Sequence, residues 1–125
     1  MNNVYNIAAF GLPVLLLDSV RKLAAGALAL KYSRHALSEA LNDRYGVLPV
    51  SAFPRAFIPG AGWTVVEVEA NPAGQLVKFV VRRNVDCDTR SLVLVVMVDG
   101  TVKTIWTNMS RDQHATLDSS KFSRP

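Results

Sequence analysis

The dipeptide Asp99-Gly100 separates the apolar run Leu92–Val98 from the alternating stretch Thr101–Thr107. Aspartate followed by glycine favours a two-residue type I′ turn, because both central residues of that turn need a positive φ. Such a turn predicts a hairpin in which Thr104 and Trp106 lie on one face of a sheet. Its register follows from the loop length and opposes these pairs of residues: Val98 and Thr101, Val96 and Lys103, Val95 and Thr104, and Val93 and Trp106.

The apolar run before the turn has a hydrophobic side chain at every position, which predicts a central strand covered on both faces. Two alternating stretches precede it, Trp63–Ala70 and Gln75–Arg83, and the turn residues Asn71-Pro72-Ala73-Gly74 lie between them. Together with Ser91–Val98 and Thr101–Thr107, these stretches predict a four-stranded antiparallel sheet.

Residues 1–46 have mostly helical periodicity. Asp18 and Ser19 can cap a first helix, whose apolar face would hold Val20, Leu23, Ala24, Ala27 and Leu28. Ser33 can cap a second helix, whose apolar stripe would hold Ala36, Leu37, Ala40 and Leu41. The stretch Leu28–Tyr32 could instead be a short strand that leads into the second helix, and the sequence leaves both interpretations open.

We therefore expect a single α+β domain over residues 1–125, with N-terminal helices packed on a four-stranded antiparallel sheet. Its parts would be a mainly helical region (1–46), a connector rich in proline and glycine (47–62), the sheet (63–108) and a polar C-terminal segment (109–125). Half of the residues are hydrophobic and 19% are charged, which excludes an intrinsically disordered chain.

Cys87 is the only cysteine, which excludes an internal disulfide and favours a reducing compartment. The apolar run from Ile7 to Leu17 is about eleven residues long, whereas a membrane span needs about 20. We therefore expect a cytoplasmic protein without a membrane span. A contact of the apolar N-terminus with a membrane or a partner stays open as an alternative.

The formal net charge of +4 and the pI near 9.6 are compatible with a polyanionic partner such as RNA. They are equally compatible with a slightly basic surface that binds no nucleic acid. The charge alone does not separate these two interpretations.

His35 and His114 are the only histidines of the chain. Two imidazoles can cleave RNA without a metal, because one can take the proton of a 2′-hydroxyl while the other protonates the 5′ leaving oxygen. Positive side chains would stabilise the charged transition state, and the candidates for this role are Arg34, Arg82, Arg83 and Lys103, with Thr104 as a hydrogen-bond donor. The alternative for His35 is an ordinary surface contact at the start of a helix.

Further polar groups follow the last predicted strand. Asp112 is two residues from His114 and could orient its ring, and Asn108 lies nearby in sequence as a candidate for substrate binding. The spacing of Asp112, His114 and Asp118 matches no known pattern of metal ligands, so we expect no metal and no cofactor. In the predicted strand that ends at Arg83, Arg82 should point to the opposite face from Arg83.

The segment Lys31-Tyr32-Ser33-Arg34-His35-Ala36-Leu37-Ser38-Glu39-Ala40, followed by Asp43-Arg44-Tyr45-Gly46, resembles the strand-then-helix opening YS-x-HA of small RelE-like proteins. That superfamily includes barnase, EndoU, colicin-type and RelE-type ribonucleases. The stretches Val102–Thr107 and Asp112–Asp118 are similar to C-terminal segments of uncharacterised phage and prophage proteins.

This resemblance implies the α+β fold expected above and a metal-independent ribonuclease of a toxin or a phage. Carried over by position, it implies that His35, Thr104 and His114 are the catalytic residues. The residues expected to bind substrate are Arg34, Arg82, Lys103, Asn108 and Asp112. The partners would be RNA and a cognate antitoxin, an immunity protein or a host protein. The alternative is a non-enzymatic phage or prophage protein that binds a host protein or packs into a larger assembly.

Overall fold

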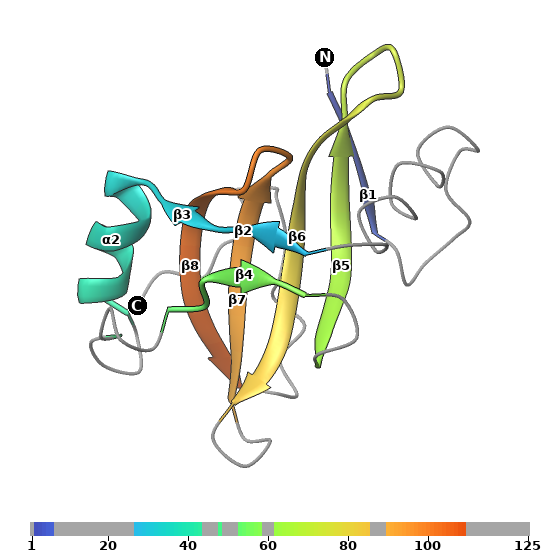
Figure 1. Ribbon diagram of the computed structural model, residues 1–125. Coiled ribbons are helices and arrows are strands. Elements are labelled where there is room, and N and C mark those ends of the chain that lie inside the picture. Colours follow the sequence, from blue (N-terminus) through green and yellow to red (C-terminus); the bar gives the residue numbers. More distant parts are fainter. Residues whose placement is uncertain are drawn as a thin grey trace.

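The computed structural model describes residues 2–6, 27–43, 48, 53–58, 62–85 and 90–109. Most of this part is a six-stranded sheet with the strand order β1-β5-β6-β7-β8-β3 (Figure 1). Its strands are β1 (Asn3–Asn6), β3 (Lys31–Tyr32), β5 (Trp63–Ala70), β6 (Leu76–Val85), β7 (Arg90–Met97) and β8 (Thr101–Met109). The other elements are a small antiparallel sheet of β2 (Leu28–Ala29) and β4 (Ala56–Phe57), and the helix α2 (Arg34–Leu41).

The predicted fold class is wrong. We expected N-terminal helices on a four-stranded antiparallel sheet, but the described residues contain one helix and a main sheet of six strands. The sheet is mixed, because β3 runs parallel to β8 while the other neighbours are antiparallel. The edge strands β1 and β3 have only four and two residues, so their pairing partners define them more than any local pattern does.

The four strands that the alternation predicts are all present. Strand β5 has the predicted bounds, and β6, β7 and β8 differ from theirs by one or two residues at an end. Strand β7 is buried on both faces over residues 91–96, as expected from its unbroken apolar run. These strands form a meander, in which each strand pairs with the next one in sequence.

The hairpin between β7 and β8 turns over three residues rather than two. The Gly100 N–H donates to the Met97 carbonyl (2.9 Å), and Gly100 has a φ of +94°, as in hairpin loops that end in a glycine bulge. The register is therefore shifted at the turn, and Val96 opposes Val102. Lys103 then forms a β-bulge that removes the shift, so the predicted pairs beyond it are confirmed: Val95 with Thr104 and Val93 with Trp106.

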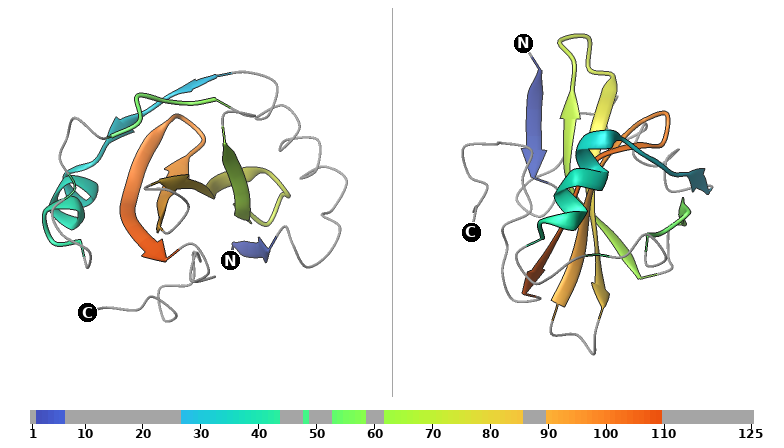
Figure 2. Two further views of the ribbon diagram at one scale, coloured as in Figure 1. Left: turned by 90° about the horizontal axis from the view of Figure 1, so that it is seen from below. Right: turned by 90° about the vertical axis from the view of Figure 1, so that its left-hand side faces the viewer.

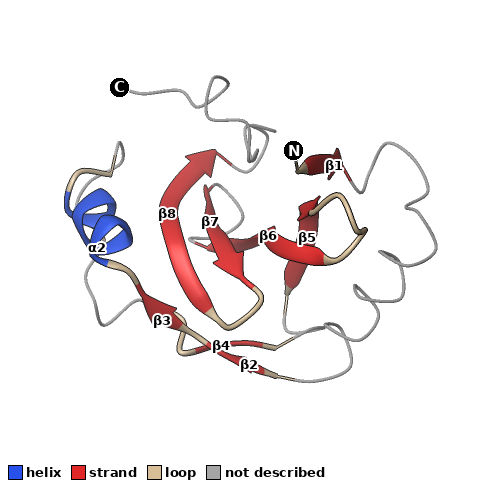
Figure 3. Cartoon of the chain, turned by 90° about the horizontal axis from the view of Figure 1, so that it is seen from above, coloured by secondary structure: helices blue, strands red, loops and turns tan. Residues whose placement is uncertain are grey.

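The two faces of the main sheet are buried by different groups. Figures 2 and 3 show the small β2–β4 sheet crossing one face, while α2 lies beyond β8. This core face holds the larger hydrophobic cluster, which includes Phe79, Val81, Leu94, Val96, Val102 and Ile105 with Ala36, Ala40 and Phe57. We call the opposite face the Thr104 face; it holds Val80, Val93 and Val95, with Val66 and Trp106 packed against them.

The described part of residues 1–46 is less helical than expected. Leu28 belongs to β2 and Ala27 to no helix, and the remainder of the predicted first helix, from Asp18 to Gly26, lies outside the described residues. The alternative for Leu28–Tyr32 is confirmed in the form of two short strands, β2 and β3. Among the described helices, none is long and apolar enough to cross a membrane.

Candidate functional site

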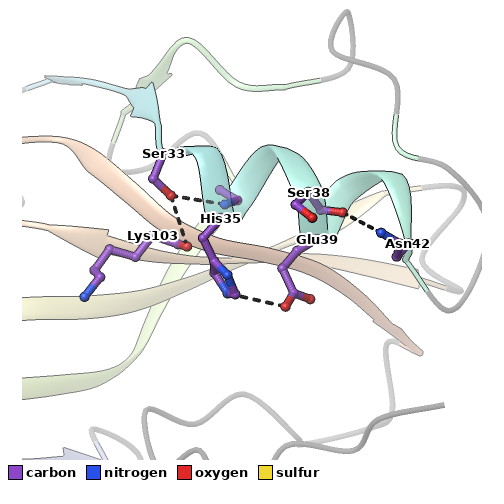
Figure 4. A network of polar contacts seen from close by, with 7 residues as sticks. Ser33, His35, Ser38, Glu39, Asn42 and Lys103 are labelled. Atoms are coloured by element: carbon purple, nitrogen blue, oxygen red, sulfur yellow. Dashed lines mark hydrogen bonds and ion pairs between the residues drawn. The ribbon is translucent and has the colours of Figure 1, made fainter.

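The place of α2 follows from the pairing of the strand before it. Strand β3 pairs with the first two residues of β8, and the Ser33 N–H extends this ladder by donating to the Val102 carbonyl (3.0 Å). The Ser33 hydroxyl then caps α2 by accepting from the Ala36 N–H (3.1 Å), as predicted, and it donates to the Lys103 carbonyl (3.3 Å). The helix therefore begins beside the β-bulge of β8 (Figure 4).

His35 has a carboxylate partner on its own helix. Its Nε2 lies 3.3 Å from the Glu39 Oε1, and the two residues are one helical turn apart (Figure 4). The His35 side chain is 62% exposed, whereas that of Glu39 is 21% exposed. A carboxylate at this distance orients an imidazole and selects its tautomer, while the exposed ring stays open to a substrate.

The two flanks of α2 have different chemistry. Ala36 and Ala40 are buried against the core face. Leu37 lies on one side of this buried stripe, where it lines a pocket with Phe53 and Pro54 from the segment before β4. His35 is about 200° from Leu37 around the helix, because each residue turns the chain by about 100°. The flank with His35 and Glu39 is therefore opposite to the flank that lines the pocket.

Two of the predicted strand residues lie on the Thr104 face. Thr104 is half-buried and opposes Val95, and Arg82 opposes Val93, which itself opposes Trp106. Arg83 belongs to the other face, where its guanidinium lies 4.5 Å from the centre of the Trp63 ring. The prediction that Arg82 and Arg83 point to opposite faces is thus confirmed.

The end of α2 is also attached to β8. Asp43 accepts a hydrogen bond from the Thr107 N–H (2.9 Å), and its second carboxylate oxygen accepts one from the Thr107 hydroxyl. Thr107 is buried, at 4% exposure. These bonds satisfy the N–H and the hydroxyl of Thr107, which lies beyond the two residues of β8 that pair with β3.

The structure brings some of the predicted site residues together. Arg34 and His35 start α2, and Ser33 connects that start to the bulge where Lys103 and Thr104 lie. Arg82 lies two strands away on the Thr104 face, and the backbone of Asn108 opposes Ser91 farther along β8. Two predicted residues lie outside the described residues, namely Asp112 and His114.

Glu39, Asp43 and Thr107 are candidate site residues that the sequence analysis missed. The spacing of His35 and Glu39 could have predicted their contact, since residues four apart on a helix are neighbours. Asp43 and Thr107 are 64 residues apart, so no local pattern indicates their hydrogen bonds.

A second feature lies on the Leu37 flank. A pocket of about 290 Å³ is lined by Leu30, Tyr32, Leu37, Phe53, Pro54 and Arg55. The Tyr32 hydroxyl donates to the Pro54 carbonyl (2.6 Å), and the rings of Tyr32 and Phe53 lie 4.7 Å apart. Burial raises the pKa of Tyr32 to about 12, against a smaller opposite effect of the Arg83 charge.

Within the described ranges, no three His, Cys, Asp or Glu side chains are grouped closely enough to hold a metal ion. Comparisons of the chain with protein-family models, with curated proteins and with solved structures gave no match.

Proposed function

We propose that this protein cleaves RNA by acid–base catalysis without a metal ion, and that His35 is one of the two proton-transfer groups. The observation that carries the proposal is the exposed imidazole of His35, held by Glu39 on the flank of α2 beside the β-bulge of β8. An imidazole that is both oriented and open to solvent can reach a bound substrate, which a buried one cannot.

In the proposed reaction, one imidazole takes the proton of a ribose 2′-hydroxyl as that oxygen bonds to the adjacent phosphorus. The bond between phosphorus and the 5′ oxygen breaks, and a second acid donates a proton to the leaving oxygen. His35 and His114 are the proposed pair. The positive charges of Arg34 and Lys103 and the hydroxyl of Thr104 would stabilise the extra negative charge on the phosphorus oxygens.

Cleavage of a single-stranded RNA by the purified protein tests this proposal, with His35→Ala and His114→Ala as the variants and a chelator present throughout. We expect cleavage by the wild type and a strong loss in both variants. His35 is exposed, so its replacement should leave the melting temperature unchanged and isolate the chemical effect. Equal cleavage by the wild type and His35→Ala would remove His35 from the mechanism, and no cleavage by the wild type would refute the activity.

A non-enzymatic interaction protein is the second candidate, and a separate observation favours it. Leu37 and Leu41 are 38% and 64% exposed on the flank opposite to His35, and Leu37 also lines the pocket. Exposed apolar groups beside a pocket are typical of a partner-binding surface. This candidate predicts a partner that co-purifies with the wild type and with His35→Ala but is lost in Leu41→Glu, while no preparation cleaves RNA.

A further inference from the structure

Helix α2 is attached to β8 at both of its ends. At its start, Ser33 donates to the Lys103 carbonyl (3.3 Å), and after its end Asp43 accepts from the N–H and the hydroxyl of Thr107. Between these two attachments, Ala36 and Ala40 pack in the core. His35 and Glu39 also lie between them, on a flank that makes neither attachment.

The lengths of the helix and the strand allow both attachments at once. The helix α2 has eight residues and covers about 12 Å at about 1.5 Å per residue, and Asn42 and Asp43 continue the chain beyond its end. The four residues from Lys103 to Thr107 cover about 13 Å of extended strand, at about 3.3 Å per residue. The helix can therefore lie along the strand with each end bonded, and the second attachment adds to the restraint that the core packing of Ala36 and Ala40 already provides.

We propose that Asp43 and Thr107 are positioning residues that fix the axis of α2 on β8 and so set the place of the His35 imidazole relative to Lys103 and Thr104. This inference rests on the proposed function, since it assigns a role to the attachment at the same site. Neither residue touches the reacting atoms. They act through the helix, because loss of the Asp43 attachment would weaken the hold on its C-terminal end, and a shift of that end would change the direction of the imidazole.

Two pairs of variants test the positioning role. Thr107→Val removes the hydroxyl at almost constant shape, and Thr107→Ser keeps the hydroxyl. Asp43→Ala removes both acceptors. Asp43→Asn keeps an oxygen that accepts from the Thr107 N–H, and its N–H₂ can donate to the Thr107 hydroxyl, which then acts as the acceptor. We expect kcat for RNA cleavage to fall about ten- to hundred-fold in Thr107→Val and Asp43→Ala, with KM unchanged. The serine and asparagine variants should stay near the wild-type rate.

A second measurement separates this inference from the proposed activity. The NMR signals of the His35 ring, assigned by their loss in His35→Ala, should shift in Thr107→Val and Asp43→Ala and match the wild type in Thr107→Ser and Asp43→Asn. A wild type that cleaves no RNA refutes the activity, and these ring signals then decide the positioning role alone. Unchanged ring signals in a folded Thr107→Val protein would overturn it, as would equal losses of kcat in the valine and serine variants.

Discussion

At the scale of single residues, the pair of His35 and Glu39 combines exposure of the ring with a fixed partner 3.3 Å away. Removing a general acid or base lowers a rate by about 10²–10⁴-fold, so His35→Gln should lower RNA cleavage by this amount. Glu39→Gln keeps an oxygen acceptor but loses the charge, and we expect a smaller loss.

Glu69→Gln is the matched control for this prediction. Glu69 also pairs with a basic side chain, the Lys78 ammonium at 3.8 Å, but it lies on β5 and away from α2. Single-turnover cleavage by the three variants, measured with the wild type at one pH, compares their effects. If Glu69→Gln and Glu39→Gln slow cleavage equally, the carboxylate of Glu39 has no special role.

Tyr32 makes stability depend on pH in the alkaline range. Burial raises its pKa from 10.0 to about 12, so the folded protein holds the phenol proton more tightly than the unfolded chain does. The stabilisation is complete below pH 10 and is lost as the pH rises from 10 to about 12. Since the side chain is only half-buried, solvent screening limits this contribution to on the order of 1 kcal/mol.

Tyr32→Phe tests this dependence. The variant loses the hydrogen bond to the Pro54 carbonyl, so at pH 8 we expect its free energy of unfolding to be about 1 kcal/mol below that of the wild type. Urea titrations at pH 8 and pH 11 should show this difference shrinking at the higher pH. A difference that stays constant between the two would contradict the altered titration of Tyr32.

At the scale of the elements, the sequence predicted strands whose own side chains carry the pattern. Strands β5 to β8 alternate or are fully apolar over eight or more residues, and turn residues separate them, so local information was enough. Strands β2, β3 and β4 have two residues each, and a pattern of period two cannot be seen over so short a stretch. Their pairing depends on distant partners, as with β3 and β8.

The candidate site also has some features that the sequence predicted and others that depend on the fold. Residue types with obvious chemistry, such as His35 and Lys103, could be selected from the sequence, and the cap at Ser33 could be predicted from its place before the helix. The loop length was predicted incorrectly by one residue, because Asp-Gly also suits a longer loop in which only the glycine has a positive φ. The bulge at Lys103 that compensates for this shift has no signal of its own in the sequence.

Gly100 connects the hairpin to β2, and its replacement should disturb both elements. A Cβ at this position would lie 2.0 Å from the Ala29 carbonyl oxygen, and the φ of +94° already disfavours any other residue. Gly62→Ala is the control, since Gly62 has a φ of +85° but its added Cβ would meet nothing closer than 3.5 Å. The backbone conformation alone costs about 1–3 kcal/mol in each variant.

We therefore expect Gly100→Ala to lower the free energy of unfolding by clearly more than Gly62→Ala does, because the backbone of β2 must also move. Chemical denaturation of the two variants beside the wild type measures this difference. Equal losses would mean that the approach of Ala29 to the hairpin is not a constraint on the fold.

At the scale of the whole molecule, α2 separates two surfaces, one on each of its flanks. The helix packs on β8 through Ala36 and Ala40, so its two flanks face different surroundings. One flank carries His35 and Glu39, and the other carries Leu37 and Leu41 beside the pocket. The proposed RNA cleavage and the alternative, partner binding, would therefore respond to substitutions on different flanks of the same short helix.

The net charge of +4 gives a last prediction for the proposed binding of RNA to the whole molecule, because the release of counterions would make such binding depend on salt. Binding is best measured on a single-stranded RNA with methylated 2′-hydroxyls, which cannot be cleaved by the proposed reaction. The logarithm of the association constant should fall linearly with the logarithm of the salt concentration. If Lys103 contacts one phosphate, Lys103→Gln should reduce the steepness of this line by roughly 0.7.

Lys78→Gln serves as the control for this measurement. Lys78 has the same charge as Lys103, but Glu69 lies 3.8 Å from it and its side chain is only 23% exposed, whereas Lys103 is exposed at the bulge beside α2. If RNA binds at the surface around Lys103, the salt dependence of binding by Lys78→Gln should have a slope close to that of the wild type. Equal reductions of the slope in both variants would indicate that RNA is attracted by the overall charge and not by the surface at the start of α2. A general attraction does not distinguish one lysine from another.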